Sequence, residues 1–172
     1  MSFLTRPTTH YKESYLQALR EFQQEGRYTN YNLKHIDHDF DLYIQHLYKQ
    51  EERDKIAPDR VPNADFWLID NNEFIGRMSL RYKLNEHLLK LGGNIGYEIR
   101  PSKRRMGYGK EILRLSLLRA KQDGLQRVLV TCDEDNIGSR KIIEHNGGHF
   151  ENAVAAETVG SPKKRRYWFD LT

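Results

Sequence analysis

The segment from Gly93 to Gly124 constrains this chain more than any other. Residues 94–99 alternate between apolar and other side chains, which predicts a strand with its odd-numbered residues on the apolar side. Pro101 ends that pattern. Apolar or small residues then recur at helical spacing, at Ile112, Leu113, Ser116, Leu117 and Ala120. Gly124 follows as a C-terminal stop, so the segment predicts a strand, a loop and a helix in direct succession.

The loop between this strand and this helix, Arg104 to Lys110, has the composition of a phosphate-binding site. The first turn of a helix leaves backbone N–H groups unpaired, and the helix dipole favours negative charge at that end. Gly107 and Gly109 remove side chains that would hold an anion away from these groups. Arg104, Arg105 and Lys110 add positive charge. The loop therefore predicts a site for a diphosphate.

Two common phosphate loops do not fit this segment. A Walker A loop requires serine or threonine after its lysine, but a glutamate follows Lys110. A Rossmann fingerprint requires a third glycine, but Ile112 stands three positions after Gly109, and the strand lies in the middle of the chain. The spacing of Arg104, Gly107 and Gly109 instead resembles the acetyl-CoA pyrophosphate loop of the GNAT superfamily of N-acetyltransferases.

The flanking sequence carries the same resemblance. In GNAT proteins the loop follows a strand of the type Gly-Tyr-x-Ile-x-Pro, and residues 96–101 read Gly-Tyr-Glu-Ile-Arg-Pro. A further strand and an Asn-led helix follow in the family, as residues 127–132 and the segment after Asn136 do here. The resemblance covers about Gly93 to Phe150. Within the superfamily the chain is similar to a bacterial group of predicted acetyltransferases without an assigned acceptor.

The resemblance implies that acetyl-CoA is the cosubstrate. In GNAT enzymes the strand before the loop splays from the next strand, and its free backbone groups bond the pantetheine arm and the acetyl carbonyl. By the motif, those groups fall at Ile99 and its neighbours. The implied coenzyme contacts are Ile99, Arg100, Arg104, Arg105, Met106, Gly107, Tyr108, Gly109, Lys110, Asn136 and Ser139. Asn136 is also a preferred helix N-cap residue, so it fits a capping role, a coenzyme role or both.

Glu98 is the candidate general base. Acetyl transfer requires a proton to leave an ammonium group, and a partly buried carboxylate can accept it because burial raises its pKa. The alternative is that Glu98 pairs across the sheet with a lysine or arginine. Ile143 stands where many GNAT enzymes carry the tyrosine that protonates the leaving thiolate. Tyr108 or water supplies that proton instead, or the thiolate leaves unaided.

Composition and length indicate one soluble domain spanning residues 1–172. The single cysteine, Cys132, excludes an intramolecular disulfide, and no apolar run approaches the roughly twenty residues of a membrane span. Without a signal peptide at its start, we expect a cytoplasmic protein. The formal charge of +4 permits nucleic-acid binding but does not require it. The spacing from His35 to Asp39 belongs to no known ligand set, so we expect no metal. A homodimer stays open.

The order of elements predicts an α/β (α+β) fold of GNAT type. We expect a central mixed, mostly antiparallel twisted sheet of about seven strands with four helices, in the order βααβββαβαββ. The remaining expected elements are a strand at Phe3–Arg6, a helix from His10 to Gly26, a helix from Asp37 or His38, a hairpin around Asn71-Asn72, and strands at His149–Val154 and Arg165–Leu171.

Together these features predict an acetyl-CoA-dependent N-acetyltransferase that acts on a primary amine of a small molecule or peptide by direct attack on the thioester. Two alternatives stay open. A non-catalytic acyl-CoA sensor is favoured by Ile143, and a protein N-terminal acetyltransferase associated with nucleic acid or the ribosome is favoured by the basic clusters. The segments expected to line the acceptor pocket, Arg27–Asn32 and Glu51–Pro62, carry no motif, so polyamines, aminoglycosides, amino acids and protein N-termini all remain.

Overall fold

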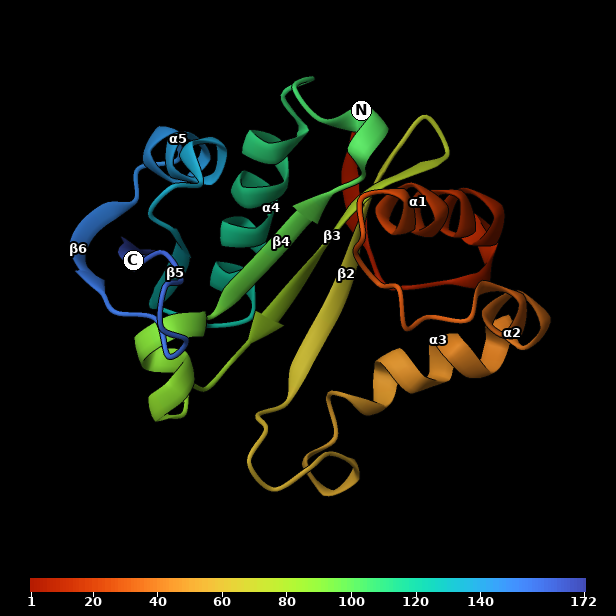
Figure 1. The fold of residues 1–172 in the computed structure, drawn as a ribbon, viewed down its shortest axis with the longest axis horizontal. Helices are drawn as coiled ribbons and strands as arrows, with labels where there is room; N and C mark the ends of the chain where they lie inside the picture. The colour runs from red at the N-terminus through yellow and green to blue at the C-terminus, as the bar shows by residue number, and fades with distance from the viewer.

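The computed structural model describes all 172 residues and contains seven strands and five α-helices (Figure 1). In chain order these are β1 (Phe3–Thr5), α1 (Lys12–Gln24), α2 (Leu33–His38), α3 (Phe40–Lys49), β2 (Asn63–Asp70), β3 (Glu73–Arg81), β4 (Ile95–Ile99), α4 (Tyr108–Gln122), β5 (Arg127–Asp133), α5 (Ile137–His145), β6 (His149–Val154) and β7 (Lys164–Asp170). Short helical turns lie at Thr9–Tyr11, Arg53–Lys55, Leu88–Gly92 and Pro101–Lys103.

The strands form two sheets, one of four strands in the order β1-β2-β3-β4 and one of three in the order β5-β7-β6. Every pairing within them is antiparallel. The tight hairpin expected around Asn71-Asn72 joins β2 to β3, and both asparagines have positive φ, at 48° and 61°. The α/β fold class and the count of about seven strands are confirmed.

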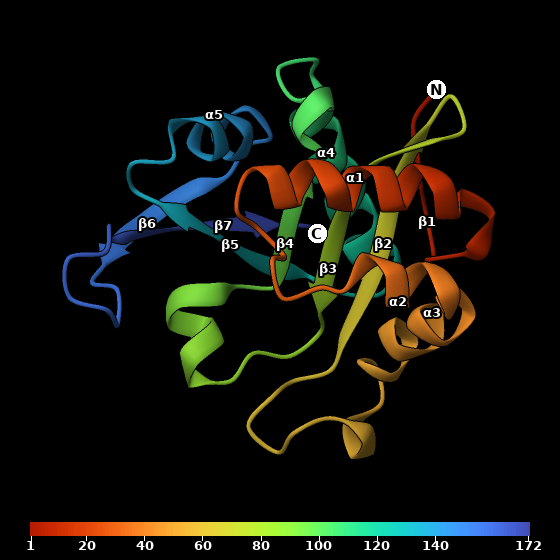
Figure 2. The same ribbon diagram turned by 45° about the vertical axis from the view of Figure 1, so that its right-hand side comes forward.

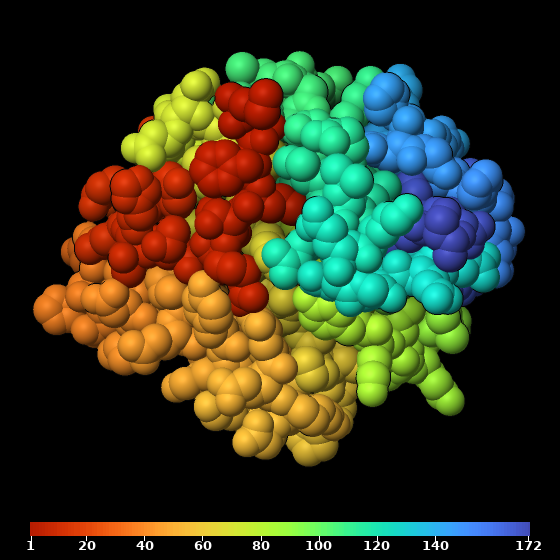
Figure 3. All heavy atoms as spheres, turned by 180° about the vertical axis from the view of Figure 1, so that it is seen from behind, coloured from red at the N-terminus to blue at the C-terminus, as the bar shows by residue number.

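Helices cover both faces of the four-stranded sheet (Figures 1 and 2). α1 and α3 pack over Trp67, Ile69 and Phe74 on one face. α4 packs on the other face, in a core shared with β5 and β7. Figure 3 shows this second side closed by α4 side chains between the N-terminal residues and the C-terminal strands. The junction between the two sheets, where β4 and β5 are neighbours, is not covered by a helix in this way.

The prediction of four helices was wrong in one place. The structure has two helices, α2 and α3, where the sequence indicated one starting at Asp37 or His38. The side chain of Asn32 accepts a hydrogen bond from the backbone N–H of His35 at 3.1 Å and so starts α2 earlier. Asp39, with φ −115° and ψ 47°, then interrupts the helical backbone before α3 begins.

Asn94 joins the two sheets at one end of β4. Its backbone N–H donates to the carbonyl of Leu129 on β5 at 2.7 Å, and its side-chain oxygen accepts from the N–H of Leu129 at 2.7 Å. Its side-chain nitrogen donates to the carbonyl of Arg81 on β3 at 3.0 Å. Beyond this point β4 and β5 diverge (Figure 2), and no backbone ladder joins them.

Replacing Asn94 by alanine should therefore destabilise the fold by about 3 kcal/mol, because the buried N–H of Leu129 and the carbonyl of Arg81 lose their partners. The measurement is the free energy of unfolding in urea. Asn152→Ala is the matched control, since the side chain of Asn152 accepts one bond from Arg166 at an exposed edge. Its loss should stay within about 0.5 kcal/mol. Equal losses in the two variants would show that Asn94 does not hold the sheets together.

Candidate functional site

A cleft of ≈ 880 Å³ opens where β4 and β5 diverge. Its walls come from the end of β4, the loop before α4 and the start of α5. The residues that line it include Tyr97, Glu98, Ile99, Arg104, Arg105, Gly107, Gly109, Lys110, Asn136, Ser139 and Ile142. Nine of these were expected at this place from the sequence, on three separate segments. We call this space the coenzyme cleft, after the ligand that the sequence resemblance implies.

Two glycines shape the floor of the coenzyme cleft. Gly107 precedes α4 with φ +89°, a conformation that glycine adopts without strain, and a Cβ there would face open space. A Cβ on Gly109 would lie 2.5 Å from Cδ1 of Ile142, so glycine also lets α4 approach α5. The backbone N–H groups of Tyr108 and Gly109 have no hydrogen-bond partner in the protein. The start of α4 therefore presents free N–H groups beside the cleft.

The cations of the loop differ in how they are engaged. Arg104 makes a two-pronged ion pair with Glu25, at 2.7 and 2.9 Å, and its Nε donates to the carbonyl of Ile99 at 3.1 Å. Arg105 and Lys110 line the cleft, are exposed and make no ion pair. These two side chains are the ones free to meet an anion.

Three of the implied coenzyme residues do not line the cleft. The guanidinium of Arg100 is buried and paired with Glu21 at 2.7 Å, so this side chain fastens the end of β4 to α1. Met106 is 62% exposed and lies outside the cleft lining. The Tyr108 side chain also turns away, and its backbone N–H, unpaired within the protein, lies at the first turn of α4.

The free edge of β4 forms one wall of the coenzyme cleft. The N–H of Arg100 donates to the carbonyl of Ile75 on β3 at 2.9 Å. Because backbone groups alternate along a strand, those of Ile99 point the other way, toward the gap. The Ile99 carbonyl accepts the bond from Arg104, and its N–H remains available to a ligand.

The start of α5 forms the opposite wall. The side-chain oxygen of Asn136 accepts from the backbone N–H of Ser139 at 3.0 Å, which is the N-cap role expected from the sequence. Both residues also line the coenzyme cleft, so capping does not remove them from the site.

The Glu98 side chain lies on the face of β4 opposite the core that α4 shares with β5 and β7. Its carboxylate accepts a hydrogen bond from Nε of Arg77 on β3 at 2.8 Å, and further bonds from Arg27 and Tyr28. The cross-sheet pairing considered from the sequence is thus present. Its side chain is 12% exposed and lies at the boundary between the coenzyme cleft and a second cleft.

Tyr108 does not reach the cleft as a candidate acid. Its hydroxyl donates to Asp70 at 2.8 Å, beside the β2–β3 hairpin and the N-terminus of the chain. The Tyr108 side chain therefore points away from the cleft, while its backbone N–H lies at the first turn of α4. Ile143 is fully buried in the core, as expected for an apolar side chain on the inner face of α5.

Sequence reasoning missed Tyr97 as a candidate. Its hydroxyl is buried beside the coenzyme cleft, near Ser139, and makes no hydrogen bond of normal geometry. Burial raises its pKa well above the usual range of a tyrosine, so it stays protonated at neutral pH. The alternation of β4 placed this ring on the core side, and only the splay of β4 from β5 makes it a wall of the cleft.

The second cleft, of ≈ 480 Å³, lies on the α3 side of the sheet and shares Arg27, Tyr97 and Glu98 with the coenzyme cleft. We call it the acceptor cleft. Side chains of β2, β3 and β4 form its floor, and its walls come from α3 and the segment Arg27–Asn32. The charged residues that line it are Arg27, Arg60, Asp65, Arg77, Arg81 and Glu98.

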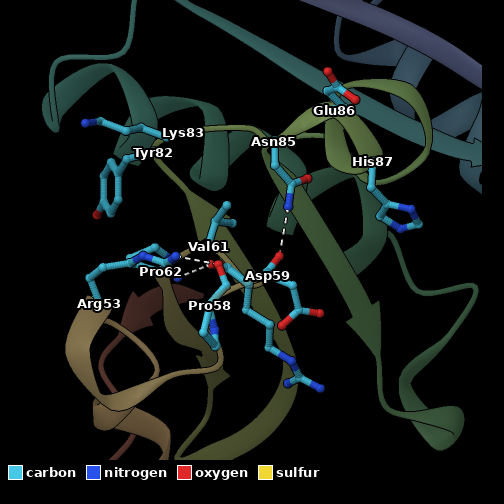
Figure 4. Close-up of a pocket in the computed structure, with 11 residues that line it drawn as sticks. Arg53, Pro58, Asp59, Val61, Pro62, Tyr82, Lys83, Asn85, Glu86 and His87 are labelled. Carbon is cyan, nitrogen blue, oxygen red and sulfur yellow. Dashed lines mark hydrogen bonds between the residues drawn. The ribbon is translucent and has the colours of Figure 1, made fainter.

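A third hollow lies beyond the acceptor cleft, between the connection at Glu51–Pro62 and the turn at Tyr82–His87 (Figure 4). Arg53 donates to backbone carbonyls of the connection, and Asn85 reaches across to the carbonyl of Asp59 at 3.1 Å. Arg60 borders both spaces. Of the connection Glu51–Pro62, which was expected to line the acceptor pocket, only Arg60 borders the acceptor cleft.

The fold and the site define a class of protein. An antiparallel α/β fold with two sheets splayed at one junction, and a glycine-rich helix start facing the gap, is the architecture of acetyltransferases that use coenzyme A. The model of the acetyltransferase (GNAT) domain matches residues 5–149, and the chain belongs to this family. The enzyme class expected from the sequence, an N-acetyltransferase, is confirmed at this level. No curated protein matches the sequence.

Solved structures share the fold at low sequence identity. The microcin C7 self-immunity acetyltransferase MccE, in complex with acetyl-CoA and AMP, is 15% identical with a TM-score of 0.70, over 98% of this chain and 92% of that one. An acetyltransferase from Salmonella typhimurium that modifies the N-terminal serine of ribosomal protein L7/L12 is 15% identical with a TM-score of 0.68, over 99% and 95%. A chimeric spermidine N-acetyltransferase SpeG from Vibrio cholerae and hSSAT is 14% identical with a TM-score of 0.66, over 99% and 95%.

Two further observations bear on the expected partners. No group of three or more His, Cys, Asp or Glu side chains is placed to hold a metal ion. None of the helices combines the length and apolar character needed to cross a membrane.

Asp65 yields a prediction about stability. Burial raises the pKa of its carboxyl above the usual range, whereas in the unfolded chain it titrates near 3.9. Since the folded state holds the proton more tightly, the stability linked to this group is fully present below about pH 4 and is lost as pH rises through the folded pKa. Asp65→Asn should therefore stabilise the protein by roughly 1 kcal/mol at pH 7 and by nothing at about pH 3, measured by urea unfolding. Asp59→Asn, an exposed control, should show neither effect. A gain that persists in acid would contradict this account.

Proposed function

We propose that this protein transfers an acetyl group from acetyl-CoA to a primary amine. The observation that carries the proposal is the start of α4, where unpaired N–H groups, two glycines and two unengaged cations face one cleft between splayed strands. A diphosphate is the ligand whose charge and size suit such a place. Membership in the family supports acetyl-CoA as the source of that diphosphate.

In this proposal each wall of the coenzyme cleft has a separate role. The N–H groups of Tyr108 and Gly109, with Arg105 and Lys110, hold the diphosphate. The free N–H of Ile99 bonds the arm that carries the thioester and places the thioester between Glu98 and Tyr97. When bound, acetyl-CoA supplies an acyl carbon activated by its thioester.

Glu98 serves as the proton acceptor, directly or through one water. Its bonds to Arg77, Arg27 and Tyr28 fix the carboxylate where both clefts meet, which is where an incoming amine passes toward the thioester. The amine nitrogen loses a proton toward Glu98 and forms a bond to the acyl carbon, and the carbon–sulfur bond breaks.

Tyr97 serves as the proton donor to the departing sulfur. Its buried hydroxyl makes no hydrogen bond of normal geometry within the protein, and burial keeps it protonated, so a proton is present when the carbon–sulfur bond breaks. In this proposal Tyr97 donates the proton to the leaving thiolate, because Ile143 has no proton to give and the Tyr108 hydroxyl is bonded to Asp70.

Gly107→Trp should abolish acetyl-CoA binding while the fold persists, because a large side chain at this position fills the entry to the free N–H groups. Calorimetry with acetyl-CoA measures the affinity. Gly124→Trp is a closely matched control: its φ of +91° carries the same backbone strain, its Cβ also meets open space, and it lies beyond the other end of α4. Unchanged affinity in Gly107→Trp, or equal loss in both variants, would refute the assignment.

The pH dependence of turnover should separate the two proton-transfer roles. The base must be unprotonated, so the rate should rise with pH as the base loses its proton. Glu98→Gln should remove that rise. Tyr97→Phe should leave it in place and lower kcat alone, because burial holds the pKa of the Tyr97 hydroxyl above the working pH range. Each variant should show roughly 10²-fold lower kcat and unchanged affinity for acetyl-CoA.

Tyr48→Phe is the control for these variants, because the hydroxyl of Tyr48 bonds only the carbonyl of Pro7 at 3.1 Å. Its profile should match the parent protein. A profile for Glu98→Gln that superimposes on the parent profile, or a kcat for Tyr97→Phe equal to that of Tyr48→Phe, would remove that residue from the mechanism.

A non-catalytic acyl-CoA sensor is the second candidate, favoured by the buried Ile143 in place of a catalytic tyrosine. The two candidates differ in one measurement, the release of free thiol from acetyl-CoA in the presence of amines. Tight binding without release across an amine panel would favour the sensor.

A further inference from the structure

The acceptor cleft carries an excess of positive charge. Four arginines line it against two carboxylates, and Glu98 already takes hydrogen bonds from Arg27 and Arg77. A cleft built for a polyamine would carry the opposite balance, because each ammonium group needs an acceptor. The charge therefore points to an acceptor that is negative away from its reacting amine.

Arg81 is the central residue of this argument. It is partly buried on β3, and its guanidinium makes a single hydrogen bond, to the carbonyl of Gly93 at 3.2 Å, with no ion pair. A guanidinium has five N–H donors, and Arg81 uses one of them, with the Asp65 carboxyl near enough to act on its charge but not hydrogen-bonded to it. Arg60, at the mouth of the same cleft, also makes no ion pair. The two side chains are free to hold one anion together.

Asp65 gives a second and independent sign of a ligand. It is only 5% exposed, it lines the same cleft, and its Oδ1 has no hydrogen-bond partner. It lies on β2 directly opposite Ser79, which places it between the levels of Arg77 and Arg81. A buried carboxyl oxygen of this kind is satisfied by a hydrogen-bond donor of the bound molecule.

The strand register sets the length of that molecule. Arg77 lies opposite Glu98, at the reacting end, and Arg81 lies four residues further along β3. Four residues of strand span about 13 Å, and side-chain reach shortens the gap to on the order of 10 Å. Gly96, opposite Ser79 on β4, adds no side chain there, so the floor between the two ends is hollow.

We propose that the acceptor is an anionic amine, whose amino group reaches Glu98 while a carboxylate or phosphate at its far end binds Arg81 and Arg60 and a donor between them meets Asp65. This inference rests on the proposed function for the identity of the reacting group, but the binding of the anion is separable from catalysis.

The test uses four amines with the same amide-containing chain, ending in a carboxylate, a phosphate, a hydroxyl or a second ammonium group. Each is titrated by calorimetry into protein saturated with coenzyme A. The carboxylate or the phosphate should bind at least tenfold tighter than the hydroxyl and ammonium compounds, and the better of the two identifies the anion. Equal or tighter binding of the diamine or the alcohol, or no binding by any of the four, overturns the inference.

Variants locate the preference. Arg81→Gln should abolish it, Arg81→Lys should retain part of it, and Asp65→Asn should weaken all four compounds alike. Arg127→Gln is the matched control, because Arg127 is an exposed strand arginine paired with Asp170 on the other sheet. A preference that survives in Arg81→Gln, with the fold verified by thermal unfolding, would place the anion elsewhere and contradict the assignment.

A parallel assay of thiol release from acetyl-CoA separates the two proposals. Anionic amines that bind selectively without any release would leave this site assignment intact and refute acetyl transfer. Acetylation of the diamine in preference to the anionic amines would support acetyl transfer and refute the anion-binding assignment.

Discussion

The separation of β4 from β5 is the constraint on which the rest of the structure depends. Asn94 joins the two strands through two hydrogen bonds to Leu129 at one end, with a third to Arg81 on β3, and no backbone ladder joins β4 to β5 beyond it. The gap exposes the backbone edge of Ile99 and leaves room for the start of α4 to face it. Closing the sheet into one continuous ladder would remove the coenzyme cleft, so the fold gives up several backbone hydrogen bonds to keep this opening.

The two clefts are lined by different kinds of chemical groups. The coenzyme cleft relies mainly on backbone N–H groups, which need glycine and a helix terminus more than particular side chains. The acceptor cleft relies on charged side chains of β2 and β3, whose identities can change without altering the sheet. Structures of similar fold are described as acting on spermidine and on a ribosomal protein, so the fold alone does not fix the acceptor.

The sequence predicted the coenzyme cleft far better than the acceptor cleft, for a physical reason. The strand, the loop and the helix from Gly93 to Gly124 are contiguous, so local spacing alone places Gly107 and Gly109 at a helix start. Asp65 and Arg81 come together through strand register, and Arg27 joins them because α1 packs over the sheet and ends beside it; no local pattern encodes these contacts. Tyr97 was missed because alternation marks it as a core residue. Tyr108 was misplaced because a backbone motif does not reveal where a side chain turns.

The ion pair between Arg104 and Glu25 has a consequence for the coupling of the two clefts. Arg104 belongs to the coenzyme loop, and Glu25 ends α1 only two residues before Arg27, which holds Glu98. Any shift of Arg104 toward an incoming phosphate has to be accommodated by the end of α1 and so by the wall of the neighbouring cleft. One guanidinium thus ties the loop before α4 to the segment that borders the neighbouring cleft, so the two walls are mechanically coupled in the protein.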